Sequence, residues 1–156
     1  MSIHIVLIEP EIPQNTGNIS RTCALTGASL HLVRPLGFSV NDKYLKRAGL
    51  DYWHLLDLHY HDSFQELLDQ VDESKFFYAT TKGGNSCYNV TFEDDCYIVF
   101  GKESGGIPME ILNKYKSQNI RIPMLENEAA RSLNLSNSVA IIAYEAMRQI
   151  GCPGLI

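Results

Sequence analysis

Three polar, glycine-rich stretches of the sequence hold the residue types that could do chemistry. They are residues 9–18, residues 101–108, and a last stretch made of residues 122–124 and 131–138. Each follows a short apolar run of the kind that forms a buried strand. In open α/β sheets, ligands bind beyond the carboxyl ends of the strands. We therefore predict that the functional site is built from these three stretches.

None of the three stretches matches a common nucleotide-binding or nucleophile motif. No G-x-G-x-x-G follows the first apolar run, and the chain contains no Walker A loop. Ser104 lacks the glycine that a nucleophile elbow needs two residues earlier, because Lys102 stands there. An ordinary dinucleotide site and a serine hydrolase are therefore both disfavoured.

Five short apolar runs, rich in β-branched and aromatic residues, predict the strands that position these stretches. They are residues 4–8, 30–33, 76–80, 96–100 and 120–123. The residues within each run are apolar at successive positions, so both faces of each strand should be buried. This pattern is typical of a parallel sheet that is covered by helices.

Helical patterns fall between the predicted strands, at residues 15–26, from residue 62 or 63 onward, after Pro108, and at residues 136–150. Asn15 or Thr16 is the predicted N-cap of the first helix, and Gly27 its stop. The alternation predicts an α/β fold with a mostly parallel sheet and helices on both faces. We expect one domain that covers residues 1–156.

The composition supports a globular, cytoplasmic protein. Of the 156 residues, 45% are apolar, which is too many for a disordered chain and enough for one core. No apolar run is long enough to cross a membrane, and the first residues do not resemble a signal peptide. The formal net charge of −5 is unexpected for a protein that binds nucleic acid, because phosphates attract basic surfaces.

The cysteines and histidines do not suggest a metal centre. No two of the four cysteines have C-x-x-C spacing, so we expect buried, reduced thiols. The five histidines cluster only loosely in sequence, and His59 and His61 have no third ligand nearby. We therefore expect no bound metal.

The order of the motifs in the three stretches resembles a known family. Residues 15–21 (N-T-G-N-x-x-R), 100–108 (F-G-x-E-x-x-G-I-P) and 131–140 (R-S-L-N-L-S-N-S-V-A) resemble the three motifs of the SpoU branch of the SPOUT RNA methyltransferases. Residues 10–15 (P-E-I-P-Q-N) and 47–52 (R-A-G-L-D-Y) resemble its small TrmL/YibK-type tRNA enzymes. Together the matching segments cover nearly the whole chain.

The resemblance implies a specific reaction and architecture. Such enzymes move a methyl group from S-adenosylmethionine to a ribose 2′-hydroxyl of RNA, without a metal. The TrmL/YibK type acts on the wobble cytidine or uridine of leucine tRNAs. The resemblance further implies a deep trefoil knot formed by the C-terminal segments, a homodimer, and binding of the tRNA anticodon stem-loop.

The resemblance also implies residue roles. The implied catalytic residues are Arg21, Glu103, Asn134 and Ser136. The implied cofactor-binding residues are Ala79, Gly101, Ile122 and Ser132. Further candidate substrate contacts are Asn18, Tyr144 and four basic residues chosen for their placement, namely Lys43, Arg47, Lys82 and Lys102. Because arginine stays protonated, Arg21 is expected to hold a phosphate and to stabilise the developing alkoxide.

Simpler structural explanations exist for some of these residues. Arg21 would be a surface arginine, and Glu103 a carboxylate at the helix that starts near Pro108. A cap of the last helix is an alternative role for Asn18, Ser132, Asn134 and Ser136, and Ser136 suits it best because it lies where that helix starts. Residues 102–106 also read K-E-S-G-G where many relatives have P-E-T-R-G, so the preferred tRNA and base stay open. The alternative functions are a non-catalytic knotted RNA-binding domain and a 2′-O-methyltransferase that acts on a different RNA.

The basic residues are unevenly placed along the chain. A net negative charge therefore does not by itself argue against RNA binding. Lys43, Lys46 and Arg47 fall together, whereas Arg21, Lys82 and Lys102 lie in or near the predicted site. We therefore expect local basic patches that bind RNA in a salt-sensitive way.

Overall fold

The computed structural model describes residues 1–39, 41, 43, 47, 50–129 and 132–156. Lys46 of the predicted basic stretch and Arg131 of the third motif lie outside the described residues. Ala48 and Gly49, within residues 47–52, lie outside them as well.

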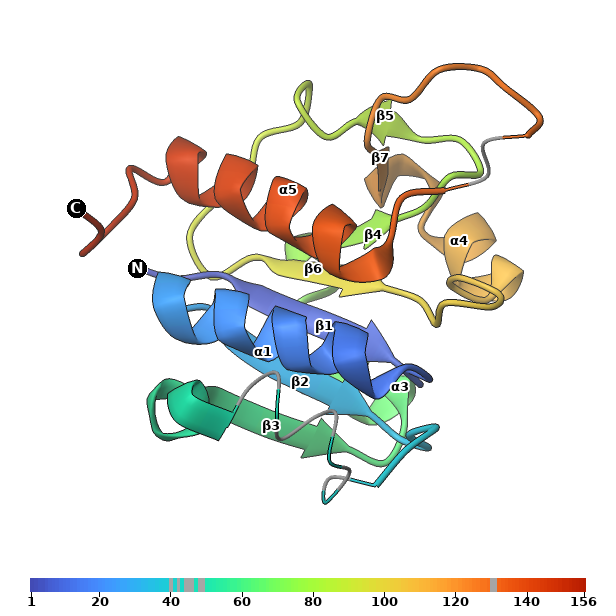
Figure 1. Ribbon diagram of the computed structural model, residues 1–156. Helices are drawn as coiled ribbons and strands as arrows, with labels where there is room; N and C mark the ends of the chain where they lie inside the picture. The colour runs from blue at the N-terminus through green and yellow to red at the C-terminus, as the bar shows by residue number, and fades with distance from the viewer. Residues whose placement is uncertain (40, 42, 44–46, 48–49, 130–131) are drawn as a thin grey trace.

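A parallel sheet runs through the described part of the chain (Figure 1). Its seven strands have the order β3-β2-β1-β6-β4-β7-β5, and every pair of neighbours is parallel. The strands are β1 (His4–Ile8), β2 (Ser29–Val33), β3 (Asp57–His61), β4 (Phe76–Ala79), β5 (Asn85–Ser86), β6 (Tyr97–Phe100) and β7 (Asn119–Arg121). The predicted α/β fold with a parallel sheet is confirmed.

The five predicted strands all form, with ends that shift by one or two residues, but β3 and β5 were not predicted. β3 lies at the edge of the sheet, and inward-packing and exposed residues alternate along it. Leu58 and Tyr60 pack against the core, while Asp57 and His59 are exposed. The prediction relied on continuous apolar runs, which are typical of central strands but not of a half-buried edge strand. β5 has only two residues, too few to show a pattern.

The α-helices are α1 (Pro13–Thr26), α3 (Phe64–Leu68), α4 (Met109–Lys114) and α5 (Leu135–Gln149). Three short 3-10 helices accompany them: η1 (Leu50–Leu55), η2 (Glu73–Lys75) and η3 (Lys116–Gln118). Gly27 ends α1 in the left-handed conformation, as predicted, and Ser63 caps α3 through its side chain.

The N-cap predicted for α1 was wrong, and of the caps considered for α5 the structure selects Asn134. α1 begins at Pro13, two residues earlier than expected, with Ile12 as an N-cap that makes no side-chain hydrogen bond. Proline suits the first helical position because its missing N–H would have no partner there. The N-cap of α5 is Asn134 rather than Ser136, since the Asn134 side chain accepts from the N–H groups of Ser136 and Asn137.

Helices cover both faces of the sheet, as predicted. α1 and α5 lie side by side in front of it in Figure 1, over a core that includes Ile5, Leu30 and Ile98. The opposite face has a second core, to which α3 and α4 contribute Phe64, Leu67 and Leu112.

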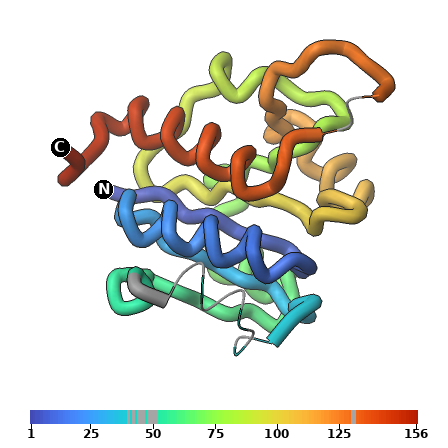
Figure 2. The backbone as a smooth tube through the Cα atoms, viewed as in Figure 1, coloured from blue at the N-terminus to red at the C-terminus, as the bar shows by residue number. Residues whose placement is uncertain are grey.

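The path of the last third of the chain brings distant segments together. β7 is the last strand in sequence, yet it lies between β4 and β5 in the sheet. After residues 122–129 and 132–134, the chain forms α5, which packs beside α1 on the front face (Figure 2). No helix among the described residues has the length and apolar character needed to cross a membrane.

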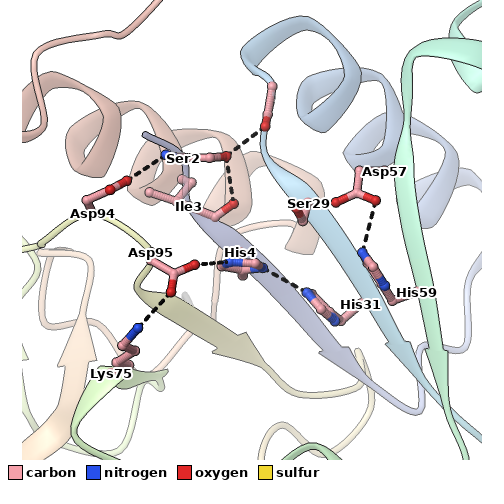
Figure 3. A network of polar contacts seen from close by, with 11 residues as sticks. Ser2, Ile3, His4, Ser29, His31, Asp57, His59, Lys75, Asp94 and Asp95 are labelled. Atoms are coloured by element: carbon pink, nitrogen blue, oxygen red, sulfur yellow. Dashed lines mark hydrogen bonds and ion pairs between the residues drawn. The ribbon is translucent and has the colours of Figure 1, made fainter. Parts of the chain in front are cut away.

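Four of the five histidines gather on one face of β1, β2 and β3, and Figure 3 shows His4, His31 and His59 among them. Nδ1 of His4 lies 2.9 Å from Nε2 of His31, and Nδ1 of His31 lies 2.8 Å from Nε2 of His61. The ring of His59 stacks on that of His31. Their loose spacing in sequence did not predict this cluster, which forms because three parallel neighbours bring the side chains together.

The four cysteines are free thiols, as predicted. Cys23, Cys87 and Cys96 are buried, and Cys152 is half-buried. Burial alone raises the pKa of the Cys23 thiol to about 12, so this group stays protonated at neutral pH.

Candidate active site

A cavity of about 710 Å³ opens where β4, β6 and β7 end. These strands are neighbours in the sheet, so the segments that follow them converge although they are far apart in sequence. The lining includes Ala79 at the end of β4, Gly101 directly after β6 and Ile122 directly after β7. Ser132 and Leu133 line it from the connection that leads to α5.

The cavity brings together many of the residues proposed from the sequence. The four implied cofactor-binding residues, Ala79, Gly101, Ile122 and Ser132, all line it. Glu103, Asn134, Lys82 and Lys102 line it as well. The lining also holds residues to which the sequence gave no role at the site, among them Thr80 and Arg121. Their positions next to predicted motifs or strand ends were the only sequence signal for them.

Gly101 is required for the shape of the loop between β6 and α4. A Cβ at this position would overlap the backbone of Gly106 and Ile107. The loop folds back on itself, with the N–H of Gly106 donating to the carbonyl of Lys102 at 2.8 Å. The glycine therefore allows a close approach within the loop itself, whereas the sequence had suggested only an approach to a ligand.

Glu103 binds the start of α1, not the start of α4. Its carboxylate accepts from the backbone N–H of Glu11 at 2.8 Å and of Ile12 at 3.2 Å. The side-chain amide of Asn15 also donates to it, at 3.4 Å. A carboxylate is favoured there by the partial positive charge of the helix N-terminus. The alternative that placed Glu103 at the helix after Pro108 is therefore wrong.

A chain of side-chain hydrogen bonds extends from Glu103 to α5. Asn15 receives a 3.0 Å hydrogen bond from the amide of Asn134, on its Oδ1. Oδ1 of Asn134 in turn accepts from Oγ of Ser136 at 2.6 Å. Residues of all three motifs are thus joined in one polar network beside the cavity.

Six of the candidate site residues are not part of the described cavity lining. Among the described residues, the cavity lining does not include Arg21, Asn18, Ser136 or Tyr144. Arg21 is exposed on α1, and its guanidinium carbon lies 4.8 Å from the centre of the Tyr52 ring. Lys43 and Arg47 are exposed on the segment between β2 and η1.

The chemistry of the lining limits what the cavity can do. Among its described residues, Glu103 is the only carboxylate, and its oxygens are occupied by α1; none is a histidine or a cysteine. Three cations, Lys82, Lys102 and Arg121, line it together with glycine backbone and apolar side chains. Such a site can hold an elongated molecule that carries an anionic group, and it favours reactions that depend on alignment.

Comparisons with known proteins find relatives that match nearly the whole chain. The model of the SpoU rRNA Methylase family matches residues 2–144. The tRNA (cytidine(34)-2′-O)-methyltransferase of Yersinia pestis is 47% identical over 160 residues, which cover 99% of this chain and 98% of that protein. The enzyme of the same name from Escherichia coli K12 is 45% identical over 155 residues, again covering 99% and 98%.

A solved structure extends the agreement to three dimensions. It comes from work on 2-OH methylation of C/U34 on tRNA, and it superimposes with a TM-score of 0.88 at 46% identity, covering 95% of each chain. The match extends over nearly the whole of both chains.

Proposed function

The chain belongs to the SpoU methylase family, and from this we propose that it methylates the ribose 2′-hydroxyl of wobble nucleotide 34, cytidine or uridine, in tRNA. The observation that carries the proposal is the convergence of the three motifs on one cavity. Residues 100–108 and the connection before α5 line it directly, and residues 15–21 join it through Asn15.

The cavity suits S-adenosylmethionine. Its volume of about 710 Å³ is in the range of ordinary ligand pockets, and its walls combine apolar side chains with backbone groups that can bind an adenine edge. Ala79, Gly101, Ile122 and Ser132 would hold this methyl donor, and a lysine or arginine of the lining would meet its carboxylate. The donor supplies an electrophilic methyl group, so the protein needs mainly to align the ribose oxygen with it.

Arg21 would act on the substrate side. It is exposed on α1, and it lies outside the described cavity lining. A guanidinium binds two oxygens of a phosphate through two parallel hydrogen bonds, and it stays charged while the ribose oxygen gains negative charge. We assign Arg21 to holding the phosphate next to nucleotide 34 and to stabilising that oxygen.

Glu103, Asn134 and Ser136 would place the reacting groups. Glu103 holds the start of α1, and Asn134 links α1 to α5, so the helix that carries Asn18 and Arg21 has a defined position at the cavity. Because the Glu103 carboxylate already accepts three hydrogen bonds from the start of α1, we assign it to positioning and not to proton removal.

The proposal includes the remaining features that the resemblance implies. They are a single domain over residues 1–156, a C-terminal trefoil knot, a homodimer, a cytoplasmic location, and leucine tRNAs bound at the anticodon stem-loop. The insertion of β7 between β4 and β5 supports the knot, because the chain must return into the sheet. The exposed Leu25 and Tyr144 on α1 and α5 support a partner on that face.

The experiment compares tRNA nucleosides from cells with and without the protein by mass spectrometry. Purified protein is also incubated with labelled S-adenosylmethionine and leucine tRNA transcripts. We expect loss of the wobble ribose methylation in the knockout, and label transfer that disappears when nucleotide 34 carries a 2′-deoxyribose. Unchanged wobble methylation together with no transfer to tRNA would disprove the proposal. Transfer to ribosomal RNA alone would favour the alternative substrate, and RNA binding without transfer the non-catalytic domain.

A further inference from the structure

Two loops beside the cavity hold each other through reciprocal hydrogen bonds. The carboxylate of Glu103 accepts from the backbone N–H of Glu11. In return, Oε1 of Glu11 accepts from the N–H of Ser104 at 2.9 Å and from its hydroxyl at 2.6 Å. Each loop thus presents a carboxylate to backbone N–H groups of the other, although they are more than 90 residues apart in sequence. We call this arrangement, formed by Glu11, Glu103 and Ser104, the clasp.

The clasp holds the chain immediately before α1. Ile12 is the N-cap of α1 and makes no side-chain hydrogen bond, so the helix has no side-chain cap of its own. Glu103 accepts from the N–H group of Ile12 and from that of Glu11, the residue before it. The orientation of α1 at its first turn therefore depends on the position of a loop that also lines the cavity.

Both halves of the clasp have firm backbone support. On one side, the N–H of Gly37 donates to the carbonyl of Pro10 at 2.9 Å. The backbone of Glu11 packs so closely that a Cβ on Gly37 would lie 2.8 Å from its Cα. On the other side, residues 102–106 are closed by the hydrogen bond between Gly106 and Lys102. The clasp therefore joins two loops whose conformations are held by their own backbone contacts. The hydrogen bonds between Glu11 and Ser104 set the position of one loop relative to the other.

The charge of Glu11 matters for this contact. The hydrogen bonds from Ser104 lower the pKa of the Glu11 carboxyl below its usual value, so the acceptor is ionised at neutral pH. An ionised acceptor makes shorter and stronger hydrogen bonds than a neutral one.

We propose that Glu11 and Ser104 are positioning residues for methyl transfer, because their contact aligns the start of α1 with the cofactor loop. The inference rests on the proposed function, since α1 carries Arg21 on the substrate side and the loop carries Gly101 on the donor side. Neither residue has to touch the reacting atoms. A shift of about 1 Å between the two sides would cost about a hundredfold in rate.

The test uses the full chain and four variants. Glu11→Ala removes the acceptor, and Ser104→Ala removes one of its two donors. Ser104→Thr keeps the hydroxyl, and Glu93→Ala is the matched control because it removes an exposed carboxylate on the turn before β6. Hydrogen exchange of the amides of residues 11, 12 and 104 is measured without RNA. Rates of tRNA methylation are normalised to the number of sites that bind S-adenosylmethionine.

We expect Glu11→Ala to accelerate exchange at all three amides and to lower kcat at least tenfold, with less than a threefold change in the KM for S-adenosylmethionine. Ser104→Ala should lower kcat about threefold, and the double variant should resemble Glu11→Ala. Ser104→Thr and Glu93→Ala should resemble the wild type. Unchanged exchange at residues 11 and 12 in Glu11→Ala would disprove the reciprocal clasp.

Faster exchange with an unchanged kcat per site would show a structural contact only, and would overturn the positioning role. A wild-type protein that binds S-adenosylmethionine but transfers no methyl group to tRNA would refute the proposed function itself. That measurement comes first, so the two failures are distinguishable.

Discussion

The amide of Asn134 donates a hydrogen bond of 3.0 Å to Oδ1 of Asn15, which lies 119 positions earlier in the chain. Asn134 is also the N-cap of α5, and Asn15 lies in the first turn of α1. One side chain therefore does two things: its oxygen caps a helix, and its nitrogen ties that helix to another. The two roles are separable by substitution.

Asn134→Asp should keep the helix cap of α5 and lose the hydrogen bond to Asn15. An aspartate accepts the same N–H groups of α5 but cannot donate to Asn15, so we expect nearly unchanged thermal stability and at least a tenfold loss of methylation. Asn134→Ala should lose both, and the missing cap should cost about 1 kcal/mol. Calorimetry and initial rates on tRNA check this. Equal stability losses in the two variants would contradict the dual role.

Gly101→Ala should distort the loop that lines the cavity. The added methyl group would overlap the backbone of Gly106 and Ile107, and such overpacking costs about 1–3 kcal/mol or more. We expect Tm to fall by several degrees, and the affinity for S-adenosylmethionine, measured by calorimetry, to fall at least tenfold. Gly105→Ala is the matched stability control, since its Cβ would meet only the end of the Lys102 side chain, at 3.4 Å. A tolerated Gly101→Ala would show that the loop can relax.

Arg21→Ala should abolish turnover while sparing the cofactor. Removing a charge that stabilises the reacting oxygen costs about 10²–10³ in kcat. Arg21 is outside the cavity lining, so the Kd for S-adenosylmethionine should change less than threefold.

Arg34→Ala is the matched control for Arg21→Ala. Arg34 also stacks on a tyrosine, with its guanidinium carbon 4.7 Å from the centre of the Tyr60 ring, but it has no assigned role. Single-turnover rates and calorimetry separate the two effects. Lost cofactor affinity with residual catalysis would contradict the role of Arg21.

The histidine cluster should make stability depend on pH. The carboxylate of Asp95 accepts from Nε2 of His4, so a neutral His4 must accept at Nδ1 from His31. His31 then accepts at Nδ1 from His61, which leaves no place for a second proton on His31. Burial, together with the neighbouring His4, His59 and His61, lowers the pKa of His31 to about 3.

The sign of the dependence follows from this pKa. An unfolded histidine titrates near 6.5, so the unfolded state binds more protons as the pH falls from 6.5 toward 3. The stability that the folded protein gains from a neutral His31 is fully present above pH 6.5. It is lost progressively as the pH falls from 6.5 toward 3. We expect the free energy of unfolding to fall by about 2 kcal/mol between pH 7.5 and pH 5. Urea titrations followed by the fluorescence of Trp53 measure it.

His31→Gln should flatten the pH dependence, because glutamine keeps hydrogen-bonding groups but does not titrate. His54→Gln is the control, since His54 makes none of the contacts in the cluster. The depressed pKa values of Asp57 and Asp95 add a further loss of stability at still lower pH. An unchanged pH dependence in His31→Gln would show that other groups dominate.

Local patterns in the sequence predicted much of the fold. Continuous apolar runs identified the central strands β1, β2, β4, β6 and β7, because a strand buried on both faces needs apolar residues at successive positions. Gly27 and Ser63 marked helix ends through conformational and capping preferences that act over a few residues. The edge strand β3 was not predicted, since exposed polar residues, Asp57 and His59, interrupt its apolar ones.

The sequence by itself also determined the family, because the three motifs occur in order and at the spacing of the SpoU methylases. It could not determine which motif residues meet. Glu103 at the start of α1, Asn134 at Asn15, and His31 between His4 and His61 are all contacts between segments far apart in the chain. They depend on the strand order and on the return of α5 beside α1, which are properties of the packed sheet. Side-chain hydrogen bonds act over about 3 Å, so only the tertiary structure decided these partners.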